Sequence, residues 1–491
     1  MPSRLASAAL TSAPMRGEPR LSWRSSALIV AATVLTRLPT VVWRRWFNPD
    51  EASIAMGAQA MQRGGRLYVD MADRKPPIPP LLYRWTFDLG GVADPRLMRW
   101  LVALATGVAT VVVANDAIRR FGRGAGWWAA ALFGAGCIAF APGDGGPANF
   151  AQIALPLAAV AIVCLRRPGW AWSLVGGALL ALAVLSRQSW VFGVPAAALS
   201  AWLASRWRGV AAAAAGFVPV IAAVAMFLPW HDFWFWTFAS TPGFVFACAD
   251  LGDVALNAVG SVALFVAFHL VQVAAAAAGW KASVRRAPDL WLWLLTGCAA
   301  AFAGFRFFGH YWLQVVPPLA MLATPVLAGA ARRWWRPAAA VLAATLVASA
   351  VFLWIPETFR RTNRPEHLAA ALQAVTQPTD RVFIWGSYAE LAVALDRPIA
   401  GTQIHSDFVT GRSGGRNLGA ETLAEATPGA LDMMMADLTA APPTLIVDTS
   451  TAPDLHYVNY PMSLIPQIAQ FVSAGYVKSD VIDGCTIYTR R

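Results

Sequence analysis

Long apolar runs separated by short polar stretches fill the chain from residue 26 to residue 355. A helix needs about 20 predominantly apolar residues to cross the hydrocarbon core of a bilayer. The pattern therefore predicts a polytopic α-helical membrane protein with about eleven membrane-spanning helices. These are expected roughly at 26–46, 97–116, 126–141, 148–165, 170–186, 189–205, 210–229, 256–279, 289–305, 312–330 and 337–355.

Every second connection between these segments is basic. The basic connections contain Arg119-Arg120, Arg166-Arg167, Arg206 with Arg208, Arg285-Arg286 and Arg332-Arg333. Lys and Arg collect in cytoplasmic loops of membrane proteins. We therefore expect the N-terminal tail, residues 1–25, to be cytoplasmic, and the chain to leave the last span on the outer side.

After residue 356 the long apolar runs give way to shorter, alternating segments. Period-2 alternation predicts strands at 381–385, 444–448 and 485–488. Helical patterns lie between them, near 365–376, 387–395, 419–438 and 464–473. The chain is thus predicted to consist of a transmembrane domain, 26–356, and an extracytoplasmic α/β domain, 357–491.

Composition agrees with a membrane location. The chain is 57% hydrophobic and 13% charged, whereas soluble domains are about 25% charged. The net charge of +12 is explained by the cytoplasmic loops, so we expect a lipid bilayer as partner and no nucleic acid. The five cysteines lack CxxC spacing, which indicates neither a disulfide framework nor a zinc site. A signal peptide could explain the basic N-terminus, but Arg37 interrupts the apolar run and favours a retained first span.

The first outer loop, 47–96, breaks the charge rule because it carries several cations, including Arg63, Arg66, Arg74, Lys75 and Arg84. An anionic lipid phosphate would explain them, and snorkelling to the headgroups is the alternative. The loop also predicts two short interfacial helices. One begins at Asn48-Pro49 and stops at Gly64-Gly65, and the other begins at Pro76-Pro77.

Asp50 and Glu51 are the candidate catalytic residues. Two carboxylates at a helix start could simply interact with the helix dipole. The functional interpretation is that one of them is a general base that takes the proton of an acceptor hydroxyl. Partial burial is expected to raise the pKa of this carboxylate and make it a better base.

Cations near this loop are the candidate phosphate ligands. Lys75, with Arg74, could stabilise negative charge that develops on a leaving phosphate, although both could also be interfacial anchors. Arg306 and His310 lie at the outer edge between two spans and could face the same cavity. Arg187, at an outer turn, is a further candidate. His310 could also ligate a metal, but a single histidine is a weak metal signal.

These motifs together resemble those of the GT-C glycosyltransferases. The matching residues are Asp50-Glu51, the 66–70 stretch, Lys75-Pro76-Pro77 and the 306–311 stretch. The chain looks most similar to bacterial relatives of dolichyl-phosphate-mannose protein mannosyltransferase and of the lipid A aminoarabinose transferase. The segment 381–386 also resembles the start of the outer domain in bacterial members.

The resemblance implies a hexosyl- or pentosyltransferase in the bacterial inner membrane. It would transfer a sugar, with inversion, from a polyprenyl-phosphate donor to a hydroxyl of a glycolipid, polysaccharide or protein outside the cytoplasm. Asp50 would be the base and Lys75 a ligand of the carrier phosphate, while Arg306 and His310 would line the cavity. No cofactor is implied with certainty, and a divalent metal stays open.

The chain departs from its relatives at two positions. Aminoarabinose transferases have a Glu before Lys-Pro-Pro, where this chain has Arg74. Many bacterial relatives have an acid after the Asn of the second outer loop, where Phe150 follows Asn149. A second carboxylate would then have to come from Asp144. The alternative function is a transporter or flippase of a lipid-linked anionic glycan, but no paired halves are visible in the sequence.

Overall fold

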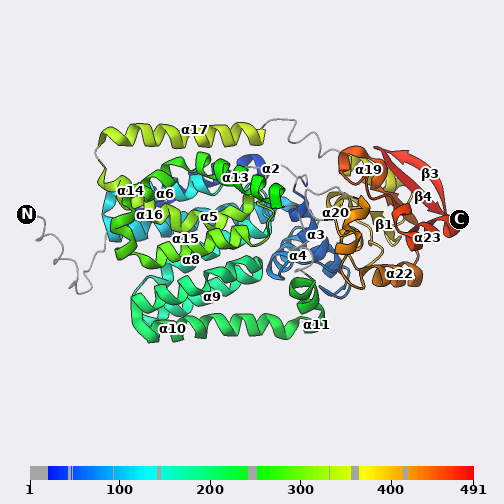
Figure 1. Ribbon diagram of the computed structural model, residues 1–491, viewed down its shortest axis with the longest axis horizontal. Coiled ribbons are helices and arrows are strands. Elements are labelled where there is room, and N and C mark those ends of the chain that lie inside the picture. Colours follow the sequence, from blue (N-terminus) through cyan, green and yellow to red (C-terminus); the bar gives the residue numbers. More distant parts are fainter. Residues whose placement is uncertain are drawn as a thin grey trace, which may run out of the picture.

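The computed structural model describes residues 20–42, 46, 48–91, 93–140, 145–240, 251–330, 332–354, 364–412 and 419–491. Figure 1 shows a bundle of helices at one end of the molecule and the C-terminal sheet at the other. Between them lie α3 (Pro49–Gln62) and α4 (Ile78–Gly90), the two short helices of the first outer loop. Both helices were predicted from the sequence.

Helices occupy all of the apolar segments. They are α1 (Trp23–Leu35), α2 (Leu38–Val42), α5 (Pro95–Phe121), α6 (Arg123–Gly136), α8 (Phe150–Leu165), α9 (Trp170–Ser186), α10 (Val194–Phe227), α13 (Leu251–Phe268), α14 (Leu270–Arg286), α15 (Pro288–Phe302), α16 (Val316–Gly329) and α17 (Trp335–Trp354). Inside α10 the backbone leaves helical geometry at Ser205 and Arg206. This break falls between two of the expected spans, 189–205 and 210–229.

The expected count of eleven spans is not confirmed. Among the described residues, Pro95–Phe121 and Gln188–Phe227 are long and apolar enough to cross a membrane alone. A third candidate is a pair of helices, Val254–Phe268 and Leu270–Arg286, bent by 89° at their junction. Several other apolar helices have only 10–17 residues, which is shorter than the roughly 20 residues that a spanning helix needs. The number of spans therefore stays a prediction.

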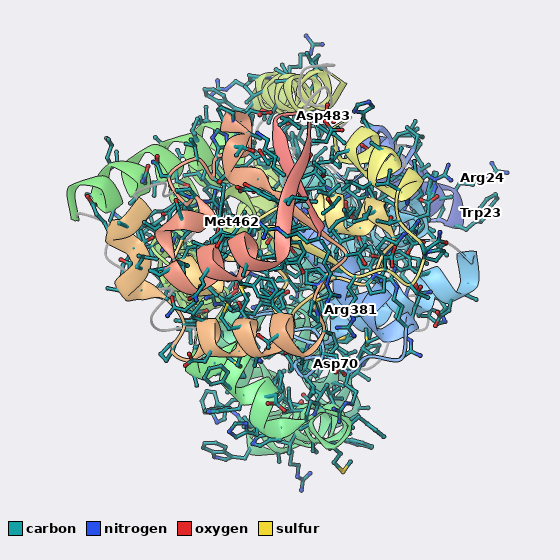
Figure 2. All side chains as sticks on the ribbon, turned by 90° about the vertical axis from the view of Figure 1, so that its right-hand side faces the viewer. Trp23, Arg24, Asp70, Arg381, Met462 and Asp483 are labelled. Carbon is teal, nitrogen blue, oxygen red and sulfur yellow. The ribbon has the colours of Figure 1, made fainter. Side chains whose placement is uncertain are left out.

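The C-terminal residues form a four-stranded sheet with the order β1-β2-β4-β3. β1 (Val382–Trp385) runs parallel to β2 (Leu445–Asp448), and the other two pairs, with β4 (Cys485–Arg490) and β3 (Tyr476–Ile482), are antiparallel. The helices of this unit are α19 (Arg364–Ala374), α20 (Ala389–Leu395), α21 (Asp407–Thr410), α22 (Ala430–Ala440) and α23 (Pro466–Gly475). Figure 2 looks onto this end of the molecule, where Asp483 lies in the turn between β3 and β4.

Three of the strands were predicted, and the fourth was not. β1 and β2 are buried along their whole length, so their apolar residues stand out in the sequence. β3 is exposed at most of its positions and lacks the apolar pattern that a buried strand has. It is held in the sheet by its pairing with β4 rather than by a buried face.

The loop 47–96, predicted to lie on the outer side, is attached to the C-terminal unit by backbone and side-chain contacts. The Ala72 amide donates to the Thr402 carbonyl at 2.7 Å, and Ala72 pairs with Gln403 as an isolated parallel bridge. The C-terminal segment that contains Thr402 and Gln403 also pairs with β1, because Ile399 forms an isolated bridge with Val382. Earlier in the loop, Arg63 forms an ion pair with Asp396 at 2.6 Å. The loop therefore lies between the bundle and the C-terminal sheet.

Candidate active site

Asp50, Lys75 and His310 meet in space although they are far apart in the sequence. Asp50 lies in the first turn of α3, which begins at Pro49 and is capped by the Asn48 side chain. Its Oδ1 is 3.4 Å from Nζ of Lys75, and its Oδ2 is 3.8 Å from Nε2 of His310. The Asp50 and Lys75 side chains are each 29% exposed, so a ligand can reach both.

Lys75 is held in place by its backbone and by an aromatic ring. The Tyr68 hydroxyl donates to the Lys75 carbonyl at 2.7 Å. The Lys75 ammonium lies over the Phe150 ring, 4.6 Å from its centroid. Phe150 is the first residue of α8 and follows the N-cap Asn149. At the position where the resemblance led us to expect an acid, this chain therefore has a π face that attracts the cation.

Arg187 lies beside this cluster and stabilises the chain around His310. Its guanidinium donates to the His310 carbonyl at 2.9 Å and to Oγ of Ser189 at 2.8 Å. It also lies over the rings of Phe150 and Tyr311, at 5.3 and 4.5 Å. Arg187 is thus near the site, and these two hydrogen bonds tie its guanidinium to the protein.

The local charges decide the ionisation of Asp50. Burial alone would raise the pKa of Asp50, but Lys75, His310 and Arg187 together hold it below its ordinary value. The expected rise in the pKa of Asp50 is therefore wrong. The sequence suggested that Asp50 is partly buried, but it did not show that these cations would pack beside it. The pKa of Lys75 is raised despite burial, because Asp50 and Asp73 lie close to it. Both groups are charged at neutral pH.

Two further carboxyl groups lie near Asp50, and neither was identified from the sequence. Burial raises the pKa of Asp73, with Lys75 opposing this effect and Asp50 adding to it. Glu390, in the first turn of α20, has a pKa raised to about 7 by burial, with Asp50 and Glu366 contributing. Asp73 belongs to the same polar run as Lys75, which was the available signal, whereas nothing marks Glu390. Asp144 lies outside the described residues.

Glu51 does not belong to this cluster. It forms an ion pair with Arg99, and neither side chain is exposed. Its Oε1 also accepts hydrogen bonds from the Tyr83 hydroxyl and the Ala148 amide, both at 2.9 Å. The carboxylate of Glu51 therefore joins α3 to α4, α5 and the segment before α8, and it cannot reach a bound hydroxyl.

Arg74 points away from Asp50 towards the C-terminal unit. Its guanidinium lies over the Phe408 ring, 4.2 Å from the centroid, and donates to Oγ1 of Thr427 at 3.1 Å. Burial lowers the pKa of Arg74 to about 10. These contacts favour a structural link between the loop and the C-terminal unit over a role at the phosphate.

Arg306 is half-buried at the edge of the site. It lies between Phe305 and Phe307, whose φ angles of 49° and 52° are in the left-handed region that non-glycine residues rarely adopt. The Ser261 hydroxyl donates to the Phe307 carbonyl at 3.0 Å and fixes this turn. The charge of Arg306 lowers the pKa of Tyr311, although burial raises that pKa overall. Arg306 is therefore near Tyr311, which lies next to His310.

A metal-binding group is not found here. Within the described ranges, no three His, Cys, Asp or Glu side chains lie close enough together to hold a metal ion. His310 and Asp50 are near each other, and the Lys75 ammonium lies beside the other carboxylate oxygen of Asp50. The arrangement fits an anion arriving at Lys75 better than a metal arriving at Asp50.

No protein-family model and no curated protein matches this chain. Solved structures do match. ArnT from Cupriavidus metallidurans bound to undecaprenyl phosphate is 15% identical, with 94% of this chain and 97% of that chain covered and a TM-score of 0.60. The archaeal oligosaccharyltransferase AglB from Archaeoglobus fulgidus, in complex with an inhibitory peptide and a dolichol-phosphate, is 12% identical, with 96% and 75% covered and a TM-score of 0.51.

The mycobacterial arabinofuranosyltransferase AftD is 15% identical, with 96% of this chain and 40% of that chain covered and a TM-score of 0.51. All three are glycosyltransferases of the GT-C superfamily, whose members are multi-pass membrane proteins. At these identities the similarity concerns the fold. The chain therefore has the fold of the GT-C glycosyltransferases, as its sequence motifs predicted.

Proposed function

We propose that this protein is a membrane glycosyltransferase that moves a hexosyl or pentosyl group from a polyprenyl-phosphate donor to an acceptor hydroxyl. The observation that carries this proposal is the cluster of Asp50, Lys75 and His310, which lies between the helical bundle and the C-terminal unit. Glycosyl transfer needs a base for the acceptor hydroxyl and a cation for the leaving phosphate, and a carboxylate and an ammonium that reach the same ligand could supply them. The fold shared with an undecaprenyl-phosphate-bound ArnT supports the donor class.

Lys75 would bind the carrier phosphate and stabilise the negative charge that develops there. Asp50 would accept the acceptor's proton while its oxygen attacks the anomeric carbon. The bond between the sugar and the phosphate oxygen breaks, and its electron pair leaves with the polyprenyl phosphate. Attack from the side opposite the phosphate inverts the anomeric configuration. Arg306, His310 and Arg187 would line the donor cavity.

The proposal includes a location. The first outer loop and the C-terminal unit, 357–491, would lie outside the cytoplasm of a bacterial inner membrane, with the bundle, 26–356, inside it. The donor would enter from the bilayer, where its polyprenyl tail is soluble. The acceptor, a glycolipid, polysaccharide or protein, would approach from the side of the C-terminal unit.

Release of polyprenyl phosphate by purified protein in lipid nanodiscs tests the proposal. The protein is given a panel of undecaprenyl-phosphate sugars with a cell-envelope extract as acceptor. We expect release with the wild type and loss of release with Asp50→Asn. Asp88→Asn is the matched control, because Asp88 lies in the same loop but is 52% exposed and pairs with Arg84.

Two outcomes would contradict the proposal. Folded Asp50→Asn protein that releases polyprenyl phosphate as fast as the wild type would exclude Asp50 as the base. Movement of intact lipid-linked sugar between the leaflets, without release, would instead favour a flippase.

A further inference from the structure

The proposed base is paired with a neighbouring ammonium. Oδ1 of Asp50 lies 3.4 Å from Nζ of Lys75, and the two side chains are equally accessible. Lys75 is also the residue proposed to bind the donor phosphate. A single ammonium cannot neutralise the carboxylate and the incoming phosphate to the same degree.

We infer that the Lys75–Asp50 ion pair is a latch that the donor phosphate opens, so that Asp50 becomes a base only after the donor is bound. The inference rests on the proposed function and adds an order of events to it. Phosphate binding would draw the Lys75 ammonium away from Asp50. The carboxylate would then be able to accept the proton of the acceptor hydroxyl.

The surroundings of Lys75 allow its side chain to move while its backbone stays in place. The Tyr68 hydroxyl holds the Lys75 carbonyl at 2.7 Å, and Pro76 and Pro77 restrict the chain that follows. The four-carbon side chain is flexible, and its ammonium has three donors that can be redistributed. Phe150 lies beneath the ammonium and provides a surface along which it can shift without losing all stabilisation.

The charged groups around Asp50 determine how its pKa changes when Lys75 moves away. Those whose charges interact with it are Lys75 and Asp73 from the first outer loop, His310 and Tyr311 from the segment before α16, Arg187 from the turn after α9, and Glu390 from α20. Arg187 is held by its hydrogen bonds to the His310 carbonyl and Ser189, so we expect it to keep its position when Lys75 moves. Once Lys75 turns to the phosphate, Asp50 loses the ammonium that lies 3.4 Å away, and the phosphate brings a negative charge close to it. The pKa of Asp50 then rises, which makes it a stronger base.

Binding of the donor before activation of Asp50 would prevent proton transfer when no sugar donor is in place. As long as Lys75 is paired with Asp50, a hydroxyl that reaches Asp50 meets a carboxylate that is a poor proton acceptor. Proton transfer to Asp50 becomes favourable only when a leaving phosphate is in place to take the electron pair of the glycosidic bond. The latch therefore predicts that the donor must bind before the acceptor can be activated.

Labelling of Asp50 with a hydrophobic carbodiimide, which reacts with protonated carboxyl groups, tests the latch. The full chain in nanodiscs is labelled over a series of pH values, and the Asp50 peptide is quantified by mass spectrometry. Undecaprenyl phosphate is the probe, and inorganic phosphate is a separate arm. With the lipid, we expect the pH midpoint of Asp50 labelling to rise by about 1–3 units, while that of Asp88 stays unchanged.

An equal rise with inorganic phosphate would also support the latch and would assign its opening to the phosphate group without the lipid tail. Lys75→Gln should show the raised midpoint with no lipid present, because the ion pair is already lost. Lys75→Arg should keep the low midpoint, which controls for misfolding of the variant.

The outcomes separate the latch from the proposed function. Lipid binding, measured by native mass spectrometry, without a shift in the Asp50 midpoint would overturn the latch alone. A low midpoint in folded Lys75→Gln protein would also overturn it. If undecaprenyl phosphate does not bind at all, both the donor assignment and the latch are wrong.

Discussion

Glu51 and Arg99 form an ion pair in which neither side chain is exposed, one residue along α3 from Asp50. The two adjacent acids of the loop therefore have different environments. Asp50 faces the cations of the candidate site, and Glu51 faces the interior. Helical geometry explains the division, because consecutive residues on a helix point about 100° apart.

Glu51→Ala should strongly destabilise the protein. It would leave the Arg99 guanidinium buried without its carboxylate, which typically costs about 3–5 kcal/mol. The Tyr83 hydroxyl and the Ala148 amide would also lose their acceptor. Thermal unfolding in detergent measures the effect, and Asp88→Asn, at an exposed position, should change stability by less than about 0.5 kcal/mol. Wild-type stability of Glu51→Ala would contradict the buried pair.

Glu390→Gln should change the pH dependence of stability. The pKa of Glu390 is raised to about 7, so its contribution is fully present at acid pH and is lost as the pH rises towards 7. This loss is on the order of 3 kcal/mol. Glu390→Gln should therefore be less sensitive than the wild type to a change from acid to neutral pH. Glu421→Gln, at an exposed position, is the control and should follow the wild type.

Arg74→Ala should loosen the loop from the C-terminal unit. It removes the contact with Phe408 and the hydrogen bond to Thr427, together worth about 1–3 kcal/mol. Hydrogen exchange should increase at the Ala72 and Ile404 amides, which form the adjoining bridge. Arg66→Ala, at an exposed pair with Asp70, should leave this exchange unchanged. Unchanged exchange in Arg74→Ala would show that the loop is held by other contacts.

Phe150→Leu should weaken binding of undecaprenyl phosphate. The aromatic face beneath Lys75 and Arg187 would be lost, at about 0.5–2 kcal/mol for a partly buried cation. This corresponds to a loss of affinity of about twofold to thirtyfold. Phe150→Tyr keeps the face and should bind as the wild type does. Equal binding by the leucine and tyrosine variants would show that the ring does not position the cations.

Much of the fold could be predicted because it follows from local patterns. Apolar runs marked the helices of the bundle, and the Asn48-Pro49 start signal marked α3. The buried strands β1 and β2 were visible from their apolar residues, whereas exposed β3 was not. The break at Arg206 falls at the connection expected between two spans. The 89° bend before Leu270 lies inside the single span expected at 256–279 and was not predicted, because it depends on packing.

The sequence predicted which residues form the candidate site better than it predicted how they are arranged. The motif brought Asp50 and Lys75 together, and the structure places them 3.4 Å apart. The direction of the Asp50 pKa shift was wrong because it depends on His310 and Arg187, which tertiary packing brings near. Arg74 adjoins Lys75 in sequence, yet its contacts lie in the C-terminal unit. No sequence rule distinguishes two neighbouring cations of this kind.

The bridge at Ala72 connects the loop that carries Lys75 to the segment 399–403, which in turn bridges β1 of the C-terminal sheet. This segment pairs with β1 at Ile399 and with the loop at Gln403, where the Ala72 amide donates to the Thr402 carbonyl. A displacement of the sheet would therefore pull on the backbone three residues before Lys75. The position of Lys75 thus depends on the C-terminal unit, and under the proposed function an acceptor that displaced this unit would also move the lysine proposed to bind the phosphate.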